Sequence, residues 1–254
     1  MFIRTERSVK DFMQFYPIVS TIIIINIAFW IITSFIPILG DIILHVGIGH
    51  NLSVYHGEYW RIVTPIFLHG GLGHVIFNSF ALVLFGPALE QMLGKIKFII
   101  MYLLTGIAGN LGTYFIDPVS MTPHLGASGA IYGLFGIYLF MVLFRKDLID
   151  YGNAQIIIVI FVIGLVMTFI RPNINIAAHI FGFIGGFALA PVLLKNARPF
   201  SMARNRRWRT SHDDVQFDPN RWNKKRVLPR NLRKNIIWII FAILVIIGFI
   251  SRYL

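Results

Sequence analysis

Long apolar blocks separated by short polar connections dominate the pattern of this 254-residue chain. A helix needs about 20 mostly apolar residues to cross a bilayer. On that basis we predict membrane-spanning helices at residues 17–36, 73–92, 97–115, 126–144, 154–170, 177–194 and 236–251. Long polar connections remain only at 37–72 and 195–235. The pattern therefore predicts an all-α polytopic membrane protein.

The spacing of these blocks divides the chain into four parts. Residues 1–16 form an N-terminal segment, and residues 17–194 form a core of six spans. A basic linker, 195–235, leads to one additional span within 236–254. The apolar run after residue 16 is too long for the core of a signal peptide and lacks an A-x-A cleavage pattern, so we expect it to be retained.

Composition supports a membrane protein, and the distribution of charge sets its orientation. Hydrophobic residues make up 56% of the chain, above the roughly 45–50% of soluble domains, and the mean hydropathy is +0.71. With the N-terminus inside, 20 of the 23 Lys and Arg residues are cytoplasmic, and only Arg61, Arg171 and Arg252 are outside. The positive-inside rule therefore predicts a cytoplasmic N-terminus.

The net charge of +12 needs no nucleic-acid partner, because topology accounts for it. Thirteen of the basic residues lie in the 195–235 linker, where they set topology and are attracted to anionic lipid headgroups. The chain has no cysteine, which excludes disulfides and thiolate chemistry.

Polar residues within spans are costly and are candidates for function. Three segments stand out: HGGLGHVIFN at 69–78, GASGAIYG at 126–133 and AAHIFGFIGG at 177–186. Each begins a span that enters from the outer face. His74, Asn78, Ser128 and His179 are therefore expected at a similar depth in the outer part of the membrane.

This set of residues is sufficient for acyl transfer. His179 can act as the base that activates the Ser128 hydroxyl. His74, the Asn78 amide and the Ser128 backbone N–H can donate to an oxyanion. Because no carboxylate lies in the outer part of these three spans, we expect a Ser–His dyad rather than a triad. The simpler interpretation is close helix packing through the glycines, with the polar side chains as interhelical donors.

At these residues the chain resembles the rhomboid intramembrane serine proteases, across about residues 12–194. GASGAIYG is similar to the GxSG nucleophile motif, HGGLGHVIFN to HxxxN, and AHIFGFIGG to AHxxGxxxG. EYWRIVTPIFLH resembles the end of the first external loop and contains Trp60, Arg61 and His69. The order of the four matches makes the resemblance specific.

The resemblance implies a rhomboid-like six-helix transmembrane bundle, with an additional C-terminal helix and a water-filled cavity that opens outward. It implies Ser128 as the nucleophile and His179 as the base, with an oxyanion site formed by His74, Asn78 and the Ser128 N–H. No metal or cofactor is expected. The supporting residues that it implies are Gly126, Gly129, Tyr132 stacked on His179, Trp60, Arg61 and His69.

The resemblance also implies the surroundings of this site. Residues 37–72 would form a membrane-embedded loop anchored by Trp60 and Arg61, and span five with loop 117–125 or 171–176 would gate substrate entry. Substrates would be single-span membrane proteins cut near the outer face. Such a chain would lie in the cell membrane, in keeping with a bacterial plasma membrane, and its oligomeric state stays open.

Two departures from the family pattern bear on the site. Ile176 lies three residues before His179, where some relatives carry a polar residue, and Asn173 or Asn175 can replace it in orienting the loop. The seventh span follows the catalytic core and is expected to be accessory.

Three other functions fit the sequence less well. A transporter or channel would favour midplane sites and inverted repeats, which the sequence lacks. A metal-dependent hydrolase would use the histidine-rich stretch with His45, His50, His56, His69 and His74, but no HExxH motif is present. A catalytically silent rhomboid relative that binds clients would be expected to lack the serine or the histidine.

Overall fold

A computed structural model describes residues 6, 8–172 and 174–205 of the chain. The chain divides into two units, 1–202 and 203–254, and the first contains all the helices named below. The predicted seventh span and linker residues 206–235 lie outside the described residues, as do Arg4, Arg7 and Asn173.

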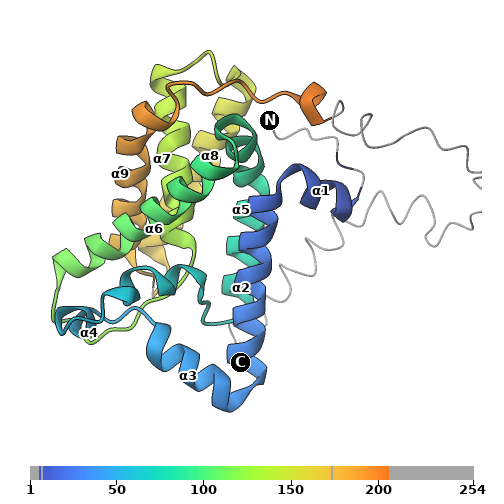
Figure 1. The fold of residues 1–254 in the computed structure, drawn as a ribbon. Helices are drawn as coiled ribbons and strands as arrows, with labels where there is room; N and C mark the ends of the chain where they lie inside the picture. Colours follow the sequence, from blue (N-terminus) through green and yellow to red (C-terminus); the bar gives the residue numbers. More distant parts are fainter. Residues whose placement is uncertain (1–5, 7, 173, 206–254) are drawn as a thin grey trace, which may run out of the picture. The chain divides into compact units, whose positions relative to one another are not determined.

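The first unit is helical throughout, as the hydrophobic pattern predicts (Figure 1). Two short 3₁₀ turns, Tyr59–Ile62 and Thr64–Phe67, precede α5. The helices are α1 (Val9–Phe15), α2 (Pro17–Phe35), α3 (Pro37–Gly47), α4 (Asn51–Tyr55), α5 (Leu72–Leu93), α6 (Lys95–Ile116), α7 (Ser128–Phe144), α8 (Tyr151–Ile170) and α9 (Ile176–Leu193).

Among the described residues, five helices are long and apolar enough to cross a membrane, namely α2, α5, α6, α8 and α9. Helix α7 is as apolar but has only 17 residues. These helices match the six predicted spans of the core to within three residues at each end. The all-α multi-pass fold class is therefore confirmed.

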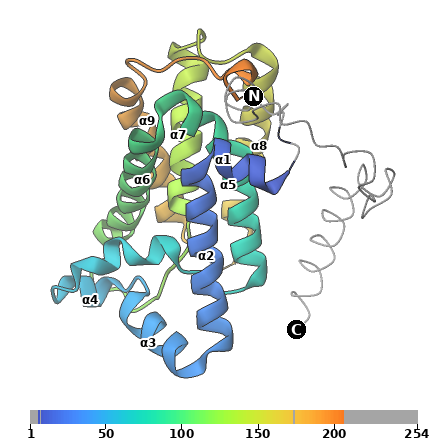
Figure 2. The same ribbon diagram turned by 45° about the vertical axis from the view of Figure 1, so that its right-hand side comes forward.

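Helix α7 forms the centre of the bundle. Every residue from Gly129 to Tyr138 is buried, so the helix has no outward face over that stretch. A helix that is apolar and buried all round belongs in the interior of a bundle. Helices α5, α6, α8 and α9 all contact it (Figure 2).

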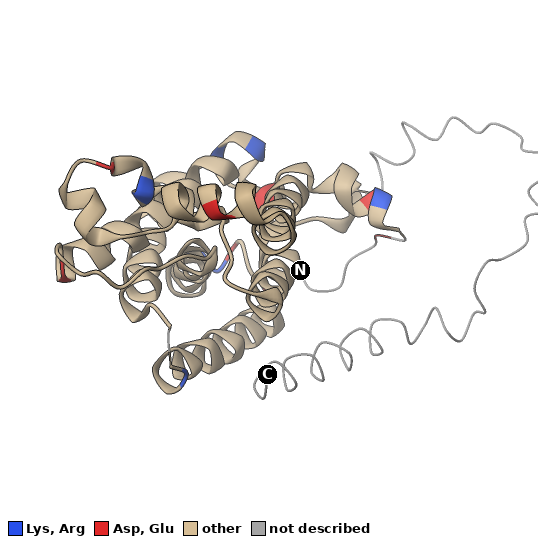
Figure 3. Cartoon of the chain, turned by 90° about the horizontal axis from the view of Figure 1, so that it is seen from below, with Lys and Arg blue, Asp and Glu red and all other residues tan. Residues whose placement is uncertain are grey.

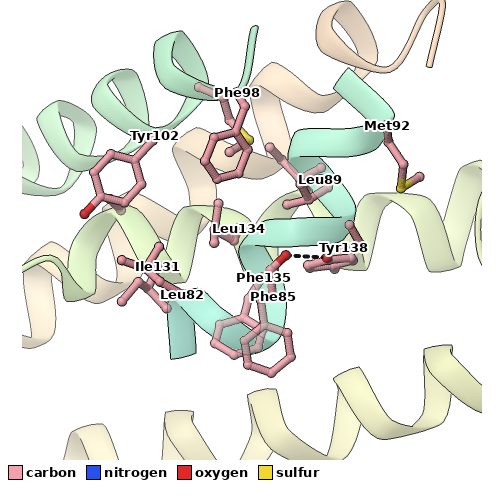
Figure 4. Packing of buried hydrophobic residues seen from close by; sticks show 14 of the residues in the cluster. Leu82, Phe85, Leu89, Met92, Phe98, Tyr102, Ile131, Leu134, Phe135 and Tyr138 are labelled. Carbon is pink, nitrogen blue, oxygen red and sulfur yellow. Dashed lines mark hydrogen bonds between the residues drawn. The ribbon is translucent and has the colours of Figure 1, made fainter. Parts of the chain in front are cut away.

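Large side chains fill the space between α5, α6 and α7 (Figure 4). Phe85 of α5 packs against Phe135 of α7, with ring centroids 4.7 Å apart. The buried Tyr138 hydroxyl donates to the Phe85 carbonyl oxygen at 2.6 Å, so its polar end is satisfied inside the apolar core. This part of the bundle resembles the interlocked core of a soluble protein.

Glycines bring α7 and α9 into backbone contact. A Cβ added at Gly182 would lie 2.9 Å from the carbonyl carbon of Gly129, and one at Gly186 would lie 2.7 Å from that of Gly133. Small residues at such spacing allow membrane helices to approach closely. The predicted glycine packing is thus present, and it joins the helices that carry Ser128 and His179.

Charged side chains are sparse on these helices (Figure 3). Glu90, near the end of α5, is 3% exposed, and its carboxylate accepts from the N–H groups of Ile18 and Val19 at 3.0 and 2.8 Å. Both amides belong to the first turn of α2, which has no side-chain cap from Tyr16, the residue before it. The buried carboxylate therefore satisfies the open end of another helix.

The connection at 37–72 differs from the expectation of a loop. It contains α3, α4 and both 3₁₀ turns, although the hydrophobic pattern predicts no element there. Helix α3 is apolar but has only 11 residues, too few for a span. Pro37 lies at its first position and Gly40 approaches Thr33 of α2, so α3 folds back against the end of α2.

Candidate active site

Ser128 and His179 lie within hydrogen-bonding distance. Ser128 is the first residue of α7, and His179 lies in the first turns of α9. The Ser128 Oγ and His179 Nε2 are 2.8 Å apart, and 51 residues separate them along the chain. The structure therefore brings together the two residues that the sequence places at a similar depth.

Backbone packing sets this distance. A Cβ at Gly129 would meet the Ala178 carbonyl oxygen at 3.3 Å, so the residues next to Ser128 and His179 touch each other directly. Asn175 begins α9: its Oδ1 accepts from the Ala178 N–H at 2.9 Å and from the Thr113 hydroxyl at 3.1 Å. This cap fixes the start of the helix that carries His179, which is the orienting role expected of Asn173 or Asn175.

Two groups hold the imidazole ring of His179. The ring of Tyr132 stacks on it, with centroids 4.1 Å apart and planes at 13°. The other ring nitrogen, Nδ1, lies 2.9 Å from the hydroxyl of Thr168 on α8. The same hydroxyl lies 2.6 Å from the Tyr132 hydroxyl.

Thr168 belongs to none of the motifs singled out from the sequence. A signal for it exists, since it is a hydroxyl residue near the C-terminal end of the charge-free run 154–170. Threonine is common in membrane helices, however, where it bonds to its own backbone. Only the three-dimensional placement separates Thr168 from such ordinary residues.

Of the predicted oxyanion donors, His74 lies close to Ser128. A Cβ built at Gly126 would lie 2.6 Å from His74 Nε2 and 3.7 Å from Ser128 Oγ, so the His74 ring packs directly on Gly126, close to Ser128. Gly126 has φ +134°, a conformation that favours glycine. In this structure the Asn78 amide donates to the His74 carbonyl oxygen at 3.1 Å, which leaves its second hydrogen available.

His69 is buried next to this group. Its side chain is 3% exposed, and its ring meets that of His74 edge to face at 5.0 Å. Desolvation, followed by the nearby His74, lowers the pKa of His69 to about 3. His69 is therefore neutral at physiological pH and adds no charge to the site.

Arg61 and Trp60 hold the 37–72 connection together. The Arg61 guanidinium is 6% exposed, pairs with Glu58 at 2.6 Å, and donates to the carbonyl oxygens of His45 and Ile48 at 2.7 and 2.8 Å. The Trp60 indole N–H donates to the Val46 carbonyl oxygen at 3.0 Å. Both side chains thus bond to backbone elsewhere in the 37–72 connection.

The 37–72 connection is also tied to the residues before Ser128. Gly49 and His124 exchange two backbone hydrogen bonds of 2.9 Å, and the Gly126 N–H donates to the Pro65 carbonyl oxygen at 2.9 Å. These contacts fix the segment of chain that leads into α7. Of the expected gate elements, loop 117–125 is therefore attached to the 37–72 connection.

No three His, Asp or Glu side chains lie close enough to hold a metal ion among the described residues, which include seven of the eight histidines and all five of the histidine-rich stretch. In the histidine-rich stretch, His50 bonds instead to the Ser53 hydroxyl at 3.0 Å through Nδ1.

The geometry allows a defined set of chemical steps. A base 2.8 Å from a hydroxyl can accept its proton during attack on a carbonyl. The first backbone N–H groups of α7 have no acceptor within the helix and can stabilise developing negative charge. With 7% of its surface exposed, His179 is largely closed to water in this state.

Comparison with known proteins places these features in a family. Residues 56–196 match the Rhomboid domain. The chain is 47% identical over 191 residues to the Bacillus subtilis (strain 168) protein named "Putative rhomboid protease YdcA", covering 75% of this chain and 94% of that one. It is 40% identical over 147 residues to Rhomboid protease GluP of the same organism, covering 58% of this chain but 28% of GluP. The RHOMBOID-like protein 9, chloroplastic, of Arabidopsis thaliana is 31% identical over 201 residues, with 74% of this chain and 45% of that protein covered.

Proposed function

This chain belongs to the rhomboid family, and from that premise we propose that it is an intramembrane serine endopeptidase acting through Ser128 and His179. The observation that carries the proposal is the 2.8 Å contact between Ser128 Oγ and His179 Nε2 inside a helical membrane bundle. In the reaction, His179 takes the Ser128 proton as Oγ attacks the scissile carbonyl. The resulting imidazolium then protonates the leaving amine, and water releases the acyl group by the same steps.

The oxyanion of the tetrahedral intermediate would lie beside Ser128, within reach of His74 and of the Ser128 N–H at the open end of α7. The Asn78 amide contributes its second hydrogen. Each such donor contributes about 10²–10³ in rate. A Cβ at position 126 would displace the His74 ring, so the positive φ and the contact with His74 both require glycine there.

The substrate class follows from depth. Helix α7 has 17 residues and is about 26 Å long, shorter than the roughly 30 Å hydrocarbon core. Ser128, at its first residue, then lies below the outer surface when the other end reaches the inner one. A single-span membrane protein exposes its carbonyls at that depth only after local unwinding, so segments with Gly or Pro are the expected substrates.

Orientation rests on charge. With the N-terminus in the cytoplasm, 20 of the 23 basic residues lie inside. The start of α7 then faces outward, and cleavage takes place near the outer face of the cell membrane.

Covalent labelling tests the proposal. In detergent, a fluorescent fluorophosphonate should label the wild-type chain, and Ser128→Ala should abolish both labelling and cleavage of a single-span substrate. His179→Ala should reduce both to background. Ser20→Ala is the matched control, because Ser20 is a buried serine of α2 that bonds to the Tyr16 carbonyl oxygen.

The outcomes separate the alternatives. Cleavage by Ser128→Ala at the wild-type rate refutes the mechanism. A folded wild-type chain that neither labels nor cleaves indicates a silent, client-binding relative. Loss of activity in a chelator, with labelling unaffected by Ser128→Ala, indicates a metal-dependent hydrolase instead.

A further inference from the structure

Helix α8 reaches the site through a single polar residue. Its inner side carries Ala154, Ile157, Phe161, Gly164 and Thr168, which follow one another at steps of three and four and so share one face. Ala154 and Ile157 are buried at one end of this row, and Thr168, 1% exposed, is buried at the other. Between them, Phe161 stacks on Phe183 of α9 at 4.7 Å. Thr168 is thus the hydroxyl at the outer end of an otherwise apolar seam.

The Thr168 hydroxyl has three oxygen or nitrogen neighbours but one proton. The Gly164 carbonyl oxygen, 2.9 Å away, can only accept, so the hydroxyl proton is directed to it. The Tyr132 hydroxyl, 2.6 Å away, then donates to Thr168 Oγ1. The remaining lone pair of Oγ1 faces His179 Nδ1 at 2.9 Å and can accept a proton from it.

This proton count assigns the tautomer of His179. With the proton on Nδ1, the neutral ring carries its lone pair on Nε2, which faces the Ser128 hydroxyl. The opposite arrangement, with Thr168 donating to Nδ1, would place a proton on Nε2 and leave the ring unable to accept from Ser128. The hydroxyl network therefore favours the tautomer that a base requires.

We propose that Thr168 is a positioning residue that holds His179 in the Nδ1–H tautomer. The reactivity of Ser128 and His179 then depends on how α8 packs against the bundle. Thr168 takes the place that an orienting carboxylate has in a triad. Position 176, where some relatives carry a polar residue three positions before the histidine, is an isoleucine in this chain. This inference rests on the proposed Ser–His mechanism. Thr168 contacts no substrate, so its effect should appear in the rate of acylation rather than in substrate affinity.

The test compares Thr168→Val, which keeps the shape but removes the hydroxyl, with Thr168→Ser, which restores it. Thr168→Val should lower the rate constant of fluorophosphonate labelling about tenfold, the order expected for one lost hydrogen bond. Its kcat on a single-span substrate should fall in parallel while KM stays within about twofold, and Thr168→Ser should recover most of the rate. Thr105→Val is the matched control, because Thr105 is equally buried and bonds to the Met101 carbonyl oxygen at 2.9 Å.

Wild-type labelling by folded Thr168→Val overturns the inference and leaves the proposed function standing. A wild-type chain that does not label overturns both. If Thr168→Val fails to fold, ¹⁵N NMR of histidine-labelled wild-type protein decides, with the His179 signals identified by their loss in His179→Ala. A proton on Nδ1 is expected, and a proton on Nε2 refutes the assignment.

Discussion

A methyl group at Gly182 should separate the two halves of the active site. Its Cβ would lie 2.9 Å from the Gly129 carbonyl carbon and 3.2 Å from the Gly129 Cα, where an ordinary contact is 3.4–4 Å. The obstacle is backbone and cannot rotate away, so α7 and α9 must move apart by at least about 0.5 Å. Gly129 follows Ser128, and Gly182 lies one turn beyond His179. The 2.8 Å contact between Ser128 and His179 therefore stretches toward the limit of a hydrogen bond.

Two quantities should change in Gly182→Ala. Overpacking of this kind costs about 1–3 kcal/mol of unfolding free energy. Misplacement of reacting groups by about 1 Å costs about 10²-fold in rate, so we expect a loss of about 10- to 100-fold in fluorophosphonate labelling. The rate is measured well below the thermal midpoint, so that unfolding does not contribute to the loss.

Gly152→Ala is the matched control for this change. Gly152 lies in the first turn of α8, and the nearest atom to an added Cβ is a carboxylate oxygen of Asp150 at 3.6 Å. The same substitution there should leave the rate within about twofold and raise stability slightly, as alanine does in helices. A Gly182→Ala protein that labels as fast as Gly152→Ala would show that backbone contact does not set the geometry of the dyad.

Two further predictions concern stability. Glu90→Gln should lower the thermal midpoint in detergent by the equivalent of about 0.5–2 kcal/mol, because the charged acceptor of two α2 amides is lost. The exposed Asp41→Asn should leave the midpoint unchanged, and equal midpoints for the two variants would contradict the role of Glu90. Desolvation, followed by the nearby His50, lowers the pKa of His124 in the folded chain to about 4 from an ordinary 6.5. The unfolded chain therefore binds the extra proton between those values, and stability should fall as pH drops from about 6.5 to about 4. His124→Gln should flatten this slope, and an unchanged slope would refute the lowered pKa of His124 as its source.

The sequence predicts the bundle well because membranes impose a simple rule. Apolar runs of sufficient length must be helical, so the six spans of the core follow from hydrophobicity to within three residues. The residues of the candidate site were identified because polar groups are costly in an apolar segment, and three of them begin spans of the same direction. The 2.8 Å distance between Ser128 and His179 depends on helix contact, for which the sequence offers only the glycine spacing and the family resemblance.

Two features could not be read from the sequence. Residues 37–72 lack a long apolar run, so their short helices are held by side-chain bonds such as those of Arg61, which depend on partners far along the chain. Thr168 has no distinctive spacing relative to Ser128 or His179. Its importance comes from the way α8 seats against two other helices, which no local pattern records.

The cap that Glu90 provides for α2 also has a consequence for biosynthesis. The carboxylate and the amides that it receives are 71 and 72 residues apart. At about 5–20 residues per second, α2 emerges from the ribosome about 4–14 s before its capping group exists. During that interval water or lipid headgroups must satisfy the first turn of α2, and arrival of α5 then replaces them. The first turn of α2 is thus capped by the protein itself only once α2 and α5 have packed together.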